Sequence, residues 1–184
     1  MPAPASVGVS GTGSTGLRTG DIVNSQEATR PADSDLCALV LGGGEPPGWS
    51  DERIADVLAR WDRALDALTG ALEVEYYGPD VGLGAGRAVY RMVVRRHRLG
   101  ACVDSWGLWI CTALPHARWR PAWRLGQVGR LRRREVIKRL PAFFDGYAGA
   151  VRQAGKDGTK AGRRILELAH RLRVAVDARD PGRQ

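Results

Sequence analysis

Six apolar residues recur at spacings of three and four in the first half of the chain: Ile54, Leu58, Trp61, Leu65, Leu68 and Leu72. This spacing lines one face of an α-helix. Ser50 can cap the helix, and Asp51 and Glu52 suit the positive end of the helix dipole. We therefore predict a long N-terminal amphipathic helix whose apolar stripe lies on a sheet. The alternative is a heptad seam in a homodimer, but the repeat lasts for under three heptads.

The segments after this helix have the residue preferences of strands. Residues 73–77, 88–97 and 101–113 are separated by glycine-containing turns, with Gly78 and Pro79 predicted to end the first strand. Helical periodicity returns near Val128 and after Thr159, and Pro141 is expected to break or kink the first of these helical segments at Leu140. The order is helix, three- or four-stranded antiparallel sheet, then two or three C-terminal helices, which predicts an α+β fold.

Composition divides the 184 residues into a tail and one domain. Residues 1–48 are mostly Gly, Ser, Thr, Ala and Pro, so we predict a mostly disordered tail, in which the apolar run 36–41 forms a buried strand or a docking segment. Residues 49–176 are predicted to form a single α+β domain, and residues 177–184 a frayed C-terminus. Glycines 11, 13 and 16 match a dinucleotide-binding pattern, but the strand and helix that this site needs are missing around them.

The formal net charge of +8 is unevenly distributed. Residues 1–83 contain five arginines and thirteen acidic residues, whereas residues 84–184 contain 23 basic and seven acidic residues. Such asymmetry indicates contact with nucleic acid or a membrane, and it also allows the two halves to attract each other. GC-rich coding can explain why arginine replaces lysine, so only the asymmetry supports a functional inference.

The densest basic segment runs from Arg118 to Arg139 and holds nine basic side chains against one acid, Glu135. Arginine binds phosphate through paired hydrogen bonds, and tryptophan can stack on a base. The candidate nucleic-acid-binding residues are Arg118, Trp119, Arg120, Trp123, Arg124, Arg130, Arg132, Arg133, Arg134, Lys138 and Arg139. The alternative interpretation is a solvated helix face with both tryptophans packed into the core.

The sequence offers no motif for catalysis or metal binding in its required context. His97 and Cys102 are an odd number of residues apart, so on one strand they point to opposite faces, which disfavours a zinc site with Cys111 and His116. Neither a nucleophile motif nor a catalytic carboxylate pair is evident. We expect no cofactor and no metal, and a binding protein rather than an enzyme.

The expected location is the cytoplasm of a bacterial-type cell, because the N-terminus lacks signal-peptide regions and the few cysteines suit a reducing compartment. The longest apolar run, 106–115, is too short to cross a membrane.

Two hypotheses about the function remain. In the first, the C-terminal half binds DNA or RNA with low sequence specificity. In the second, it is a protein–protein interaction module that docks an acidic partner, or its own acidic first helix, without nucleic acid.

Overall fold

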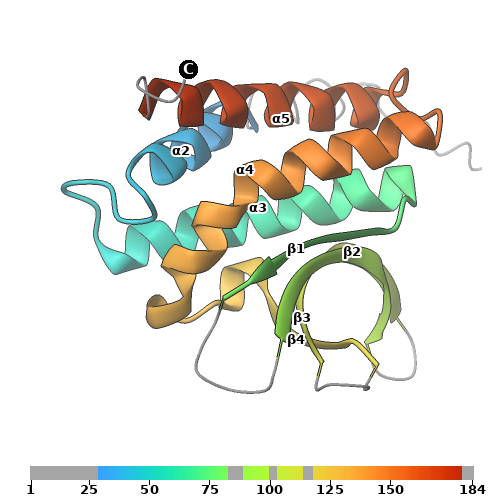
Figure 1. The fold of residues 1–184 in the computed structure, drawn as a ribbon, viewed down its shortest axis with the longest axis horizontal. Coiled ribbons are helices and arrows are strands. Elements are labelled where there is room, and N and C mark those ends of the chain that lie inside the picture. Colours follow the sequence, from blue (N-terminus) through green and yellow to red (C-terminus); the bar gives the residue numbers. More distant parts are fainter. Residues whose placement is uncertain (1–28, 83–88, 100–102, 114–117, 180–184) are drawn as a thin grey trace, which may run out of the picture.

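The computed structural model describes residues 29–82, 89–99, 103–113 and 118–179. The helices are α2 (Thr29–Leu41), α3 (Asp51–Leu72), α4 (Arg130–Gln153) and α5 (Lys160–Arg179). The strands are β1 (Tyr76–Val81), β2 (Val89–Leu99), β3 (Val103–Ala113) and β4 (Arg120–Arg124), and a short 3-10 helix, η1 (Leu125–Gln127), joins β4 to α4. The predicted α+β class is confirmed. The helices lie together on one side of the sheet (Figure 1).

The sheet has the order β1-β2-β3-β4, and all neighbouring strands are antiparallel. The β2–β3 hairpin curves strongly (Figure 1). One face contributes Met92, Val94, Leu108 and Ile110 to the main core, together with α3 and α4. The other face carries a smaller apolar cluster, to which Trp109 belongs. Both faces of the sheet therefore carry apolar side chains, and the helices cover the face that belongs to the main core.

Helix α3 is organised by a local cap and an apolar stripe. The Ser50 side chain accepts a hydrogen bond of 3.2 Å from the backbone N–H of Arg53, as the sequence predicts for an N-cap. The helix ends at Glu73, which adopts a left-handed conformation with φ 49°. The buried members of its stripe are Ile54, Leu58, Trp61, Leu65 and Leu72.

The helix α3 is not the first ordered element, because α2 precedes it. The sequence predicts a buried strand or a docking segment at 36–41 within a tail that extends to residue 48. The structure corrects the strand and the tail boundary, because this segment is helical and docks on the rest of the fold. Leu36, Leu39 and Val40 are buried on one helix face, and α2 packs against α3 and α5. The helix was not predicted because a short apolar run looks the same in a buried strand and in a buried helix. The helix that covers it, α5, also lies far along the chain. The tail prediction for residues 1–28 falls outside the described residues.

Strand β1 extends further than its sequence predicts. Gly78 and Pro79 were expected to end it, but the strand continues through both to Val81, with an irregular register between Tyr77 and Asp80. A proline is tolerated because β1 is an edge strand. A Cβ on Gly78 would lie 2.6 Å from a ring carbon of Phe143, so glycine allows α4 to approach the sheet closely.

Helix α4 continues through Pro141, so the break that the sequence allows there is wrong, and the kink stays a prediction. Proline cannot donate the backbone hydrogen bond at this position, which costs about 3 kcal/mol in a helix interior. Ile137 and Leu140 before the proline and Phe143 and Phe144 after it are all buried in the same core. Burial of both halves offsets the lost hydrogen bond, so the helix continues past the proline. Among the described residues, none of the helices has the length and apolar character needed to cross a bilayer.

Replacing Pro141 by alanine is expected to raise the free energy of unfolding by about 1–3 kcal/mol, because alanine restores the backbone donor. Urea titration measures this as a higher midpoint with an unchanged slope. Pro47 lies in an exposed turn and provides the control, since Pro47→Ala removes a proline without adding a helix hydrogen bond. An unchanged or lower midpoint for Pro141→Ala would show that the proline ring itself stabilises the core.

Candidate functional site

The candidate basic residues separate into three groups by their surroundings. Arg124 and Arg133 are nearly buried in ion pairs, with only 12% of each side chain exposed. Arg130 and Lys138 are exposed but paired with an acid. The remaining five are exposed and have no acidic partner among the described residues: Arg118, Arg120, Arg132, Arg134 and Arg139. We call these five residues the arginine surface.

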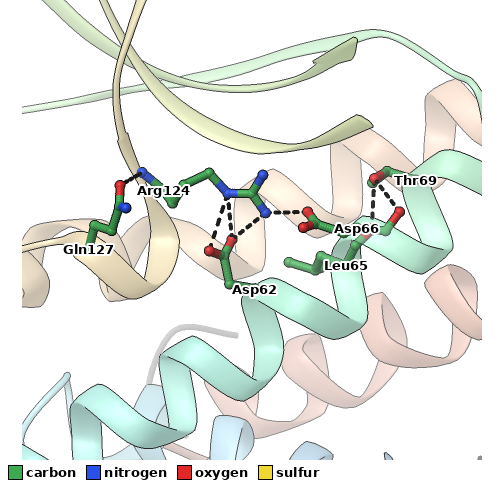
Figure 2. Close-up of polar contacts among 6 residues, drawn as sticks. All are labelled: Asp62, Leu65, Asp66, Thr69, Arg124 and Gln127. Atoms are coloured by element: carbon green, nitrogen blue, oxygen red, sulfur yellow. Dashed lines mark hydrogen bonds and ion pairs between the residues drawn. The ribbon is translucent and has the colours of Figure 1, made fainter. Parts of the chain in front are cut away.

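Arg124 joins β4 to α3 (Figure 2). Its Nε lies 3.2 Å from both carboxylate oxygens of Asp62, and its Nη2 hydrogen-bonds Asp62 and Asp66. The guanidinium also lies over the ring of Trp109, 4.6 Å from its centroid. Burial alone would lower the pKa of Arg124, but the hydrogen bonds and charges of Asp62 and Asp66 outweigh burial and raise it. Arg124 is therefore part of the internal structure and does not present its head group to a ligand.

Asp51, the first residue of α3, binds two arginines from the start of α4. Its carboxylate lies 3.0 Å from Arg130 and 3.5 Å from Arg133, and its carbonyl oxygen accepts a hydrogen bond from Arg133. Arg133 thereby fixes the start of α4 to the start of α3. Arg130 keeps 73% of its side chain exposed, so its ion pair is a weak surface pair that a phosphate can replace.

The start of α4 also contacts β4. The guanidinium of Arg132 lies over the ring of Trp123, 4.5 Å from the centroid. Arg120 lies in the same cross-strand row as Thr112 and Tyr90, and Tyr90 stacks on Trp123 at 5.2 Å. These contacts connect the part of the arginine surface on β4 with the part on α4.

Positive charge also surrounds Glu135 on the exposed side of α4. A hydrogen bond from Lys138 is the largest cause of the lowered pKa of Glu135, and the charges of Arg134 and Arg139 lower it further. Lys138 and Glu135 pair at 2.8 Å. One carboxylate thus faces three cations here, and the exposed side of α4 remains positive.

Both tryptophans of the basic segment have rings that contact other parts of the protein. Trp119 packs against the small cluster of Val93, Trp109 and Cys111, and Arg91 lies over its ring at 4.8 Å. Trp123 is half-buried against Tyr90 and carries Arg132 on its ring. The packed arrangement that the sequence left as the alternative accounts for these contacts. The contacts place Arg132 beside β4 and Arg134 beside Gly44, and neither tryptophan ring is offered as an open platform.

The first turn of α4 has an unusual composition for a helix start. Its N-cap is Gly129, which makes no side-chain capping bond, and no acidic residue lies in the first turn. Helix α3 instead has Ser50 and two acids, and α5 has Thr159, whose hydroxyl accepts a 2.9 Å hydrogen bond from the backbone of Gly162. Arginines are unfavourable at the positive end of a helix dipole, and the acid that meets them here is Asp51, from the start of α3.

Two strand arginines, Arg91 and Arg95, lie on the sheet face that carries the smaller cluster. Arg91 pairs with Asp80 at 2.7 Å, and Arg95 shares its strand face with Arg91 and Val93, the face that carries the smaller cluster. For the zinc hypothesis, Cys102 and His116 lie outside the described residues. Burial raises the pKa of the Cys111 thiol to about 11, which leaves it protonated and unreactive at neutral pH. No group of three metal-binding side chains occurs within the described ranges.

Sequence patterns alone missed two features of this site. Asp51 was interpreted only as a residue that suits the helix dipole, although it also pairs with Arg130 and Arg133. Leu131 fits a helical apolar pattern, but the structure leaves it 96% exposed. Comparisons with protein-family models, curated proteins and solved structures find no match to this chain. Function is therefore inferred from the geometry and charge of the described residues.

Proposed function

We propose that the protein binds nucleic acid with low sequence specificity through the arginine surface and the first turn of α4. The observation that carries the proposal is the uncapped start of α4, where Arg130 and Arg132 are exposed at the positive end of the helix. The carboxylate of Asp51 offsets part of the positive charge at this helix end, and an approaching phosphate would offset more of it. A nucleic acid carries one phosphate per nucleotide, so it can bind several such arginines at once.

The expected low specificity follows from the kind of contact. Guanidinium groups bind phosphate oxygens through paired hydrogen bonds, and these contacts position a protein without reporting base sequence. Arg118 and Arg120 on or beside β4, together with Arg134 and Arg139 on α4, extend the phosphate path beyond the first turn. Affinity should therefore depend on salt much more than on sequence.

Acids of the first half of the chain neutralise some of the arginines of the second half. Asp62 and Asp66 of α3 neutralise Arg124, and Asp51 pairs with Arg130 and Arg133. The acidic first half thus already meets the basic second half inside the folded protein. The arginine surface is the exposed remainder, so an acidic protein partner is the competing proposal for this same surface.

A salt series tests the proposal directly. When binding of a labelled duplex is measured by fluorescence anisotropy, log K should fall linearly with log salt, with a slope of about −0.9 for each arginine that contacts a phosphate. Two duplexes of unrelated sequence should give the same affinity within about threefold. Polyglutamate of equal charge is the control competitor. Displacement by polyglutamate as effective as by unlabelled duplex would favour the acidic protein, and a slope near zero would contradict nucleic-acid binding.

A further inference from the structure

Leu131 is the most exposed large apolar side chain among the described residues. It is 96% exposed, whereas the next, Val174 on α5, is 52% exposed. Successive residues of a helix are separated by about 100° around its axis, so the side chains of Arg130, Leu131 and Arg132 spread apart from one another. Arg130 points to Asp51 and Arg132 to Trp123, which leaves Leu131 between them and directed away from the protein. An apolar side chain thus projects from the middle of a basic surface.

The form of nucleic acid can be inferred from the same contacts. A protein that binds single strands without sequence preference normally stacks bases on open aromatic rings. Trp119 and Trp123 contact other side chains through their rings, as Arg91, Arg132 and Tyr90 lie on them. Around the first turn of α4 the described residues therefore offer phosphate contacts and a projecting apolar side chain, whereas the exposed aromatic ring of Tyr77 lies on the edge strand β1.

We infer that the arginine surface binds double-stranded nucleic acid, and that Leu131 enters a groove of the duplex while Arg130 and Arg132 hold the phosphates on either side. This inference rests on the proposed function. Apolar side chains such as leucine are known to wedge between base steps when arginines bind the surrounding backbone. The anchoring of α4 by Arg133 and Asp51 holds Leu131 in place before binding, so little ordering is needed when the duplex arrives.

The test compares wild type with Leu131→Ala on a duplex and on a single strand of the same sequence. The wild type should bind the duplex at least about tenfold more tightly. Leu131→Ala should weaken duplex binding by about tenfold and leave the salt slope unchanged, because leucine contributes apolar burial and no counterion release. Leu131→Phe keeps an apolar wedge and should retain the wild-type affinity within about threefold.

Val174→Ala is the matched control, since it shortens an exposed apolar side chain on a helix outside the arginine surface and should leave duplex affinity unchanged. Leu131→Ala should keep the thermal midpoint, because an exposed side chain adds little to stability. Equal or tighter binding of the single strand, or an unchanged duplex affinity in Leu131→Ala, would overturn the inference and leave the proposed function standing. Failure to bind both forms would overturn the proposed function itself.

Discussion

Replacing Arg132 and Arg134 together by glutamate is expected to weaken duplex binding by about 50-fold near 0.1 M salt. Each arginine that contacts a phosphate contributes close to one unit to the salt slope, so loss of two contacts removes about two units. The new carboxylates also repel the phosphates. The same anisotropy titration at several salt concentrations measures both the affinity and the slope.

The fold should survive this double substitution. Glutamate at position 132 lies in the first turn of α4 and suits the helix dipole, which offsets the lost contact between Arg132 and Trp123. Glutamate at position 134 lies four residues before Lys138, in the favourable orientation for a helical ion pair. The thermal midpoint is therefore expected to stay within a few degrees of wild type or to rise. If the variant loses duplex binding but keeps the wild-type thermal midpoint, the loss of binding is not caused by unfolding.

The matched control is Lys160→Glu combined with Arg163→Glu. These two residues are exposed at the start of α5, which lies at the opposite end of the helical layer from the start of α4 (Figure 1). The change in net charge is the same in both variants. Because salt screens charges beyond about 10 Å, the control should lose less than about threefold in affinity. Equal losses in the two variants would mean that net charge, and not the arginine surface, governs binding.

The elements that the sequence predicts well are those with local causes. Ser50 caps α3 through a neighbouring backbone N–H, and the stripe from Ile54 to Leu72 repeats within a single helix, so no distant residue is needed to recognise it. Helix α2 was missed because its stabilising partner, α5, comes much later in the chain. The continuation of α4 past Pro141 was not predicted for the same reason, since the local cost of a proline is clear from the sequence but the core around Phe143 and Phe144 that offsets it is not.

Composition indicates which residues could form the candidate site, but it does not indicate which of them are exposed. Arg120 and Arg124 look alike in sequence, yet one is exposed and the other is enclosed by acids of α3. The acid that pairs with Arg124 lies 62 residues earlier, and the backbone oxygen that binds Arg133 lies 82 residues earlier. Such separations leave no periodic signal. The charge asymmetry indicates that the halves can attract each other, and the structure identifies which arginines pair and which remain exposed.

Arg124 is expected to matter for stability, and Arg124→Ala should lower the free energy of unfolding by about 3–5 kcal/mol. The substitution leaves Asp62, whose side chain is 14% exposed, without its guanidinium partner, and it removes the cover of Trp109. Burying an unpaired carboxylate costs more than the lost attraction alone, because the carboxylate is no longer solvated by water or by arginine. Urea titration with circular dichroism measures the loss as a lower midpoint.

Arg120→Ala on the same strand is the control, because an exposed arginine without an acidic partner among the described residues should change stability by less than about 0.5 kcal/mol. Arg124→Lys keeps the charge but cannot hold both carboxylates with a planar fork, so an intermediate loss is expected. The Lys variant also separates the two roles that the sequence left open for this residue. If Arg124 acts only inside the fold, the folded Lys variant binds duplex with the wild-type salt slope. A slope reduced by about one unit would instead place Arg124 in direct contact with phosphate.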